Sequence, residues 1–334
     1  MNPKSTSTPV VSPEQRTEPQ QPALRLEDLR VSLRDGTPLL RGVDLEVNAG
    51  EGLALLGESG SGKSLTAQAI MGLLPNTCTV EGRIESDGLD LRSLTPRQMQ
   101  SVRGARIGLV FQDSLSALNP VHRVGAQIGE ALRIREGLSR AQAKERALEL
   151  MRRVRIPDAE ARYRSYPHQF SGGMRQRVAI AIALAQSPRI LIADEPTTAL
   201  DATVQLQILH LLKSLQQQLC MGLILITHDL KAAAAIADRV AVMYAGRIVE
   251  TGPTTSLLAH PHHPYTCALL RAIPSRNRRA GHLDVLPGGP PELTAELSGC
   301  PFRFRCSDAI EICSTTDPRL TPRDTQGACA CHVK

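Results

Sequence analysis

The distribution of hydrophobic positions predicts a strand-rich beginning for the folded part of the chain. The runs "LRLEDLRVSL" (24–33) and "VDLEV" (43–47) predict β-strands, because turn-forming segments such as "RDGTP" and "NAGEG" bound them. The apolar stretch "GLALLG" (52–57) predicts a buried strand, and "KSLTAQAIMGLL" (63–74) has helical periodicity. A glycine-rich turn therefore lies between a buried strand and a helix.

The middle of the chain, from about residue 120 to 186, has helical patterns without strand alternation and predicts a helical insertion. Strand patterns return at "RILIAD" (189–194) and "GLILIT" (222–227), separated by the helical segment 202–219, and a hairpin pattern follows at 239–252. Strands that alternate with helices favour a parallel sheet. We therefore expect an α/β fold with a mainly parallel sheet, an N-terminal antiparallel β subdomain and a helical subdomain.

The two ends of the chain differ from this pattern. Residues 1–23 contain five prolines among polar residues and lack the apolar stretch of a secretory signal, so we expect a disordered tail. The main domain is expected over 24–272, a linker rich in proline and glycine over 273–299, and a cysteine-rich extension over 300–334.

Composition narrows the possible functions. Aromatic residues make up 2% of the chain and tryptophan is missing, so the core must be aliphatic. The longest apolar run, 178–185, is under half of the roughly 18 residues that suggest a membrane span. The net charge is +6, but the arginines are scattered, without the lysine block or interleaved aromatics of a nucleic-acid groove. We expect neither a membrane-spanning segment nor a nucleic-acid partner.

The glycine-rich turn "GESGSGKS" (57–64) fits the pattern G-x-x-x-x-G-K-[ST] in the strand–turn–helix context of a phosphate-binding loop. Glycines let backbone N–H groups point at phosphate oxygens, the lysine contributes positive charge, and the serine hydroxyl can bind Mg²⁺. A chance glycine turn is the alternative for the motif alone. The predicted ATP-binding residues of the loop are Gly57, Ser59, Gly60, Ser61, Gly62, Lys63 and Ser64.

Two acidic residues follow the predicted strand "RILIAD". Asp194 is a candidate Mg²⁺ ligand, and Glu195 is placed to polarise an attacking water as a general base. A capping or surface acid pair is the alternative. Upstream, Ser171, Gly172 and Gly173 open a helical segment, which creates a second anion-binding helix N-terminus.

These motifs together resemble the ATP-binding subunits of ABC transporters. The similarity rests on the loop 57–64, "SGGMRQR" (171–177), "LIADEP" (191–196), "ALD" (199–201) and "ITHD" (226–229), and it covers about residues 24–252. The resemblance implies that two such subunits dimerise head to tail, with each ATP between the loop of one and residues 171–173 of the other. It also implies three residue roles: Gln112 is the Q-loop glutamine that senses Mg²⁺ and the membrane subunit, Asp201 is the D-loop aspartate, and His228 contacts the γ-phosphate.

Within the family, "SLSALNPVHRVGAQIGEAL" (114–132) and "HPYTCALLRAIP" (263–274) resemble the ATPases of dipeptide and oligopeptide importers. The resemblance implies a place at the cytoplasmic face of the inner membrane. It implies as partners a second ATPase subunit, preferably different in sequence, two membrane permeases and an extracytoplasmic solute-binding protein. A nickel or metal-chelate importer and a soluble non-transport ABC ATPase are the alternatives. We interpret the histidines of "HPHHPYT" (260–266) as a surface turn.

Five of the eight cysteines lie in the extension 300–334, and in a reducing compartment such clustering favours metal binding. Cys300, Cys306, Cys313 and Cys331 have the spacing of the same branch, whose members are thought to hold a [4Fe–4S] cluster there; zinc is the alternative. Cys329 is then extra. A linker separates these cysteines from Lys63 and Glu195 in the sequence, and phosphoryl transfer involves no electron transfer, so we expect a structural role.

Overall fold

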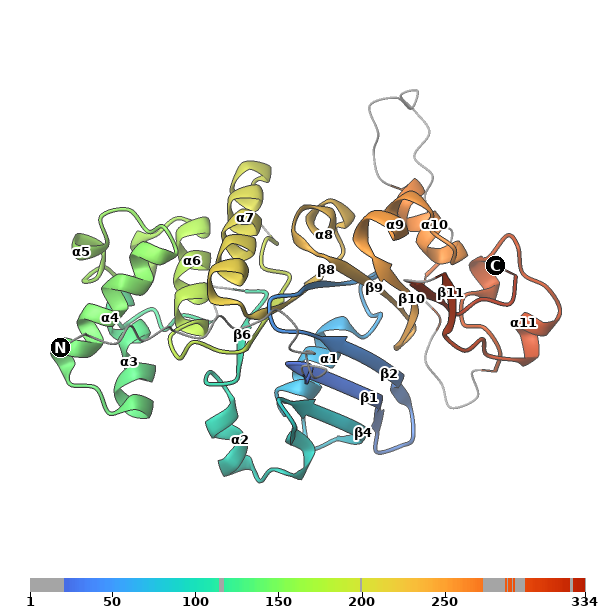
Figure 1. The fold of residues 1–334 in the computed structure, drawn as a ribbon, viewed down its shortest axis with the longest axis horizontal. Coiled ribbons are helices and arrows are strands. Elements are labelled where there is room, and N and C mark those ends of the chain that lie inside the picture. Colours follow the sequence, from blue (N-terminus) through green and yellow to red (C-terminus); the bar gives the residue numbers. More distant parts are fainter. Residues whose placement is uncertain are drawn as a thin grey trace, which may run out of the picture.

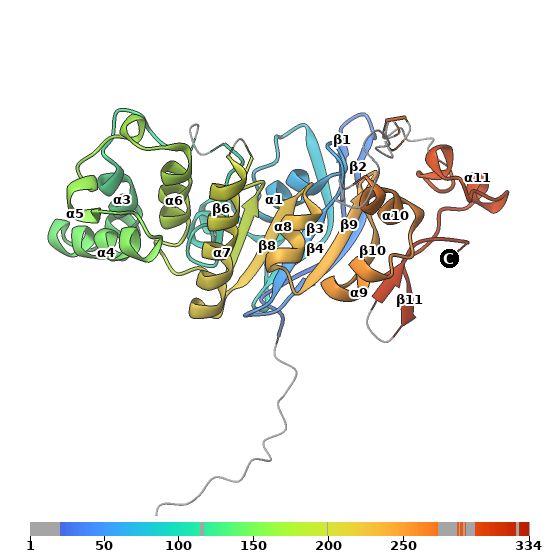
Figure 2. The same cartoon turned by 90° about the horizontal axis from the view of Figure 1, so that it is seen from above.

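The computed structural model describes residues 21–113, 117–198, 200–272, 286, 288–289, 291, 298–324 and 327–333. Two sheets lie at the centre, a helical region lies at one end, and the cysteine-rich extension lies at the other (Figures 1 and 2). Most of the predicted tail and linker falls outside the described residues. Among the described residues, no helix combines the length and apolar character that crossing a membrane requires.

The larger sheet has the strand order β11-β12-β10-β9-β3-β8-β7-β6. Its strands are β3 (Gly52–Leu56), β6 (Ile107–Val110), β7 (Ile190–Asp194), β8 (Gly222–Thr227), β9 (Arg239–Tyr244), β10 (Arg247–Pro253), β11 (Thr321–Asp324) and β12 (Gly327–Cys329). Strands β9, β3, β8, β7 and β6 are parallel to their neighbours in this series, as predicted. Because β3 and β8 are buried at every position, they read as continuous apolar runs in the sequence.

The smaller sheet is antiparallel and has the order β2-β1-β4-β5. It consists of β1 (Leu24–Leu33), β2 (Pro38–Val47), β4 (Cys78–Ser86) and β5 (Leu89–Asp90). Helix α1 (Lys63–Ile70) follows β3, and the short elements η1 (Leu91–Ser93) and α2 (Pro96–Val102) connect β5 to β6. Buried residues of β1, β3 and α1, among them Leu24, Leu53 and Ile70, belong to one hydrophobic cluster, so the two sheets share a core.

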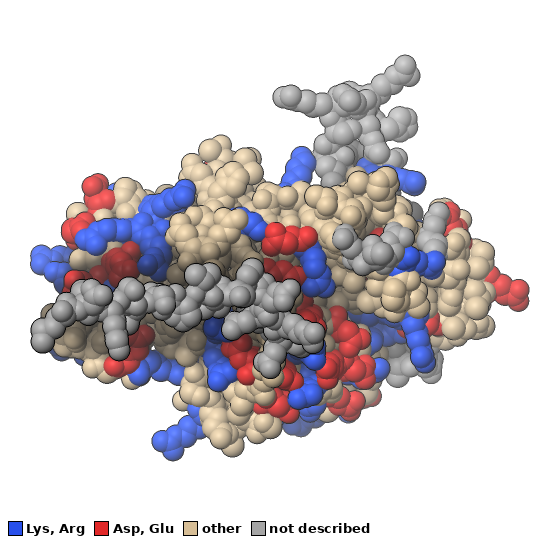
Figure 3. All heavy atoms as spheres, in the orientation of Figure 1, with Lys and Arg blue, Asp and Glu red and all other residues tan. Residues whose placement is uncertain are grey.

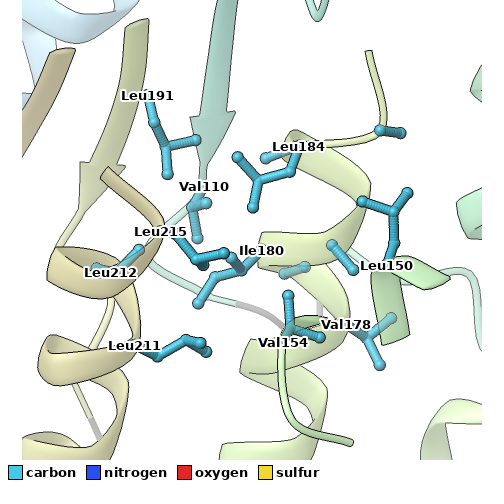
Figure 4. Packing of buried hydrophobic residues seen from close by; sticks show 14 of the residues in the cluster. Val110, Leu150, Val154, Val178, Ile180, Leu184, Leu191, Leu211, Leu212 and Leu215 are labelled. Carbon is cyan, nitrogen blue, oxygen red and sulfur yellow. The ribbon is translucent and has the colours of Figure 1, made fainter. Parts of the chain in front are cut away.

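The helical region comprises α3 (Val124–Glu136), α4 (Arg140–Arg153), α5 (Ala159–Arg162), η2 (Pro167–Gln169) and α6 (Gly172–Ala183). Helix α7 (Ala202–Leu219) lies between this region and the sheet (Figure 1). Ile180 of α6, Leu212 of α7 and Leu191 of β7 are buried in one cluster, shown in Figure 4. The packing is aliphatic, as the composition predicts, and it fixes the N-terminus of α6 relative to the sheet.

The carboxyl-terminal part packs against the other end of the sheet. Helices α8 (Leu230–Ile236), α9 (Thr254–Ala259) and α10 (Pro264–Arg271) precede the extension, which contains η3 (Arg303–Arg305) and α11 (Ile312–Thr315). Strand β12 pairs with β10 through Glu250 and Cys329, so the extension continues the central sheet. On the face drawn in Figure 3, basic and acidic side chains are interspersed.

Candidate functional site

The loop after β3 has a backbone that glycine allows and larger residues do not. Gly57 has φ of 154°, and a Cβ atom there would lie 2.4 Å from the carbonyl oxygen of Met243. Gly62 has φ of 108°, and a Cβ atom there would lie 2.7 Å from Leu40 Cδ2. Since α1 begins at Lys63, the loop opens directly into a helix N-terminus. This geometry fits a phosphate-binding loop.

Lys63 holds its ammonium group inside this loop. Its Nζ donates hydrogen bonds to the carbonyl oxygens of Gly57 and Glu58, each at 2.8 Å, and the residue is only 6% exposed. Burial lowers the pKa of Lys63, although the carboxylates of Glu195, Asp194 and Glu58 act in the opposite direction. The loop therefore presents a partly desolvated positive charge, as phosphate binding requires.

Ser64, in the first turn of α1, contacts Asp194 at the end of β7. The hydroxyl of Ser64 donates to Asp194 Oδ1 at 3.0 Å, so two of the three predicted Mg²⁺ ligands are adjacent. Burial raises the pKa of Asp194, while the hydrogen bond from Ser64 lowers it. A hydroxyl beside a partly buried carboxylate at the end of a strand suits a hard, oxygen-preferring cation, so the residues fit Mg²⁺.

Glu195 is the centre of a second polar group. Its two carboxylate oxygens contact His228 Nδ1 at 3.1 Å, Thr198 Oγ1 at 2.8 Å and Gln112 Nε2 at 3.3 Å. The structure thus brings together three predicted residues, Glu195, His228 and Gln112. Thr198 is an addition that no sequence pattern indicated. The predicted Mg²⁺ role of Gln112 is untested, since its hydrogen bond is to Glu195.

The backbone and charge of Glu195 are both unusual. Its φ of 43° is rare for a residue with a side chain and is the kind of strain found at functional sites. Burial acts to raise the pKa of Glu195, but hydrogen bonds from His228 and Thr198 outweigh it and leave the pKa below the ordinary value. The carboxylate is therefore ionised and oriented at neutral pH.

The second predicted anion-binding site lies at the start of α6. Ser171 caps this helix, with its Oγ accepting from the N–H of Met174 at 3.3 Å. Gly173 lies against α7, because a Cβ atom there would be 2.5 Å from Val204 Cγ1. In both Figure 1 and Figure 2, α6 lies apart from α1 and its loop. The described residues therefore do not bring Ser171, Gly172 and Gly173 to Lys63 within one chain.

Asp201 is placed as a helix cap. Its Oδ1 accepts from the N–H groups of Thr203 at 3.1 Å and Val204 at 3.0 Å, so it begins α7. This local role does not test the D-loop assignment that the resemblance implies.

The predicted metal centre of the extension is not supported. Cys313 and Cys331 lie close enough to Cys300 and Cys306 for their charges to raise both pKa values; burial has the larger effect and brings that of Cys300 to about 11. In the described part of the chain, however, no group of three or more histidine, cysteine, aspartate or glutamate side chains is placed to hold a metal ion.

Comparison with known proteins identifies the family. The ABC transporter family model matches residues 40–198, and the model of the oligopeptide/dipeptide transporter C-terminal region matches 249–313. A relative from Sinorhizobium fredii, described as a probable peptide ABC transporter ATP-binding protein, is 50% identical over 88% of this chain and 89% of its own length. The chain belongs to the ABC transporter ATP-binding proteins.

Other relatives and solved structures agree with this ABC ATPase assignment. The oligopeptide transport ATP-binding protein OppD of Bacillus subtilis is 48% identical over 89% of this chain and 85% of its own length. The dipeptide transport ATP-binding protein DppD of the same organism is 45% identical over 93% of this chain and 94% of its own length. The structure of cbiO1 from Clostridium perfringens, part of an ABC transporter complex, has a TM-score of 0.64 and 31% identity over 72% of this chain and 92% of its own. The ABC ATPase fold and the hydrolysis of ATP follow from this membership.

Proposed function

We propose that this ABC ATPase energises the import of di- or oligopeptides, with residues 57–64 binding ATP and Ser64 and Asp194 holding Mg²⁺. The observation that carries the ATP site is the convergence of Lys63, Ser64 and Asp194 at one end of the sheet. Mg²⁺ neutralises charge on the transferred phosphoryl group. Glu195 orients and polarises the attacking water, and His228 and Thr198 hold its carboxylate in place.

A second ATPase subunit completes the site in this proposal. Ser171, Gly172 and Gly173 form an anion-binding helix N-terminus that has no phosphate-binding loop beside it in the described chain. A solved relative, the cassette MJ0796, is dimeric and bound to ADP and phosphate in its structure, at 29% identity and a TM-score of 0.62 over 69% of this chain and 98% of its own. We expect a partner of similar but different sequence.

The peptide substrate is inferred from the relatives and from the carboxyl-terminal family match over residues 249–313. A role as the ATPase of such an importer implies three membrane or extracytoplasmic partners, namely two permeases and a solute-binding protein. It also implies a peripheral position at the cytoplasmic face of the membrane. Nickel or metal-chelate import is the alternative substrate class.

For the extension, we propose a [4Fe–4S] cluster bound by Cys300, Cys306, Cys313 and Cys331. Four thiolates are the donor set of such a cluster, and its sulfur ligands lie farther apart than those of one zinc ion. Cys313 and Cys331 both contribute to the raised pKa values of Cys300 and Cys306, which supports the grouping. Cys329 is buried in β12, outside this set.

The test of the main proposal is co-purification of the full chain from membranes in mild detergent, followed by reconstitution with the proteins found. A second ATPase, two permeases and ATP hydrolysis stimulated by a peptide-loaded binding protein are the expected results. Stimulation by a nickel-loaded protein and not by peptide would favour the alternative substrate. Recovery of the chain without any membrane protein would refute the transport role.

A further inference from the structure

The phosphate-binding loop is held by a residue of the cysteine-rich extension. The guanidinium group of Arg305, in η3, donates from Nη1 to Glu58 Oε2 at 2.8 Å and from Nη2 to Glu58 Oε1 at 3.0 Å. This paired geometry is the strongest that arginine and a carboxylate form. The Arg305 side chain is 6% exposed, so solvent screens the pair only weakly. The extension therefore contacts the phosphate-binding loop directly, although a linker separates the two in the sequence.

The backbone of Glu58 is also fixed from the carboxyl-terminal side. Its N–H donates to the hydroxyl of Tyr265, in α10, at 2.8 Å. Its carbonyl oxygen accepts from Lys63 Nζ at 2.8 Å. A short path of hydrogen bonds thus runs from Arg305 through Glu58 to Lys63.

Aromatic packing holds Arg305 in position. Phe302, one residue before η3, is 2% exposed and meets the ring of Tyr244 edge-on, with centroids 5.3 Å apart. It also lies 5.5 Å from the ring of Tyr265. Only eight tyrosines and phenylalanines occur in the chain, and three of them meet here. The Arg305 guanidinium carbon lies 5.8 Å from the centre of the Tyr244 ring. The extension therefore presents Arg305 from a rigid base.

We propose that Arg305 is a positioning residue for ATP, which neutralises Glu58 and fixes the phosphate-binding loop, so that the docked extension sets the affinity of the site for nucleotide. This inference rests on the proposed ATP site at residues 57–64. Without Arg305, a partly buried carboxylate would stand unpaired next to the loop. Its charge would then repel the phosphates that Lys63 attracts, and the repulsion would be larger for ATP than for ADP.

The experiment measures the affinity of the purified full chain for ATP and ADP by isothermal titration calorimetry. Arg305→Gln should weaken ATP binding about tenfold and ADP binding less, since a tenfold change corresponds to about 1.4 kcal/mol. The double variant Glu58→Gln/Arg305→Gln should bind ATP close to the level of the unaltered chain, because removing the carboxylate removes the repulsion. The control is Arg319→Gln, the same substitution at an exposed arginine of the same extension, which should leave affinity unchanged.

Three results would overturn the positioning role. They are unchanged ATP affinity in Arg305→Gln, a double variant as weak as the single one, and equal weakening in Arg319→Gln. If Arg305→Gln does not fold, Arg305→Met takes its place; it removes the charge, keeps much of the apolar length of the side chain and must bind ATP more weakly than the unaltered chain. Absence of ATP binding by the unaltered chain would overturn the proposed function together with this role, so the two failures are distinguishable.

Discussion

His228 lies with its Nδ1 3.1 Å from Oε1 of Glu195, and the two residues follow the neighbouring strands β7 and β8. Because these strands are parallel, their carboxyl ends meet at one edge of the sheet and bring together residues 33 positions apart. The hydrogen bond fixes which way the carboxylate faces. A water that binds to the Glu195 carboxylate would then be held in one orientation.

This geometry predicts the effect of Glu195→Gln. The amide keeps the shape of the side chain but cannot act as a base, so ATP binding should persist while kcat falls by about 10²-fold or more. The measurement is steady-state hydrolysis by the reconstituted complex, with the second ATPase subunit inactivated so that its site does not mask the loss. Thr198→Val is the matched control: it removes one hydrogen bond to Glu195 and should cost less. Undiminished hydrolysis by Glu195→Gln would contradict the base assignment.

A second prediction concerns the site at the start of α6. Gly173 is a poor position for a test, because any side chain there would meet Val204. Ser171 is exposed, and aspartate caps a helix about as well as serine does. Ser171→Asp should therefore keep the fold, yet its charge should repel ATP held by a partner subunit. We expect hydrolysis by the assembled complex to fall at least about tenfold, while the ATP affinity of the isolated chain stays unchanged.

The control for this prediction is Ser171→Asn, which caps the helix equally well without a charge and should retain most of the hydrolysis. Lys63→Ala serves as the reference for loss of binding within one chain. If Ser171→Asp lowers the ATP affinity of the isolated chain as far as Lys63→Ala does, residue 171 acts in its own chain and the paired site is wrong.

The elements around the ATP site were predictable because their signals are local. The apolar runs at β3, β7 and β8 are buried parallel strands, and the glycines of the loop occur where the backbone demands them. The same holds for α7, whose predicted and observed limits agree. Each of these signals is contained within fewer than twenty residues, so no long-range contact is needed to read it.

The docking of the extension could not be predicted in this way. Arg305 and Glu58 are 247 positions apart, and neither stands in a periodic pattern that points to the other. His263 also differs from the expected surface turn: it is 2% exposed and caps α10. One hint of this docking was present in the composition. Aromatic residues are scarce in this chain, and three of them, Phe302, Tyr265 and Tyr244, pack together where distant segments meet.

The burial of His263 predicts a dependence of stability on pH. Burial lowers its pKa to about 4 from the ordinary 6.5, and the positive charge of Arg247 acts in the same direction. The folded chain thus keeps the ring neutral, with Nδ1 accepting from the N–H of Tyr265 at 3.0 Å. Since the unfolded chain binds a proton first as pH falls, the free energy of unfolding should decrease from pH 6.5 toward 4, by up to about 3 kcal/mol.

The measurement is the thermal unfolding midpoint of the full chain between pH 7.5 and about pH 5. His263→Asn is the comparison, because asparagine keeps a capping acceptor for α10 and does not titrate. The midpoint of the unaltered chain should fall more steeply with decreasing pH than that of the variant. Parallel curves would show that His263 does not carry the pH dependence.

The final prediction concerns the cysteines next to Arg305. If Cys300, Cys306, Cys313 and Cys331 bind a [4Fe–4S] cluster, the anaerobically purified chain should contain about four irons and four sulfides. Cys306→Ser should abolish this content, whereas Cys329→Ala, at a buried position in β12, should retain it. Because Cys306 directly follows Arg305, loss of the cluster should also loosen η3 and weaken ATP binding in the same direction as Arg305→Gln. Stoichiometric zinc without iron would refute the cluster, and unchanged ATP affinity in Cys306→Ser would show that the docking of Arg305 does not depend on it.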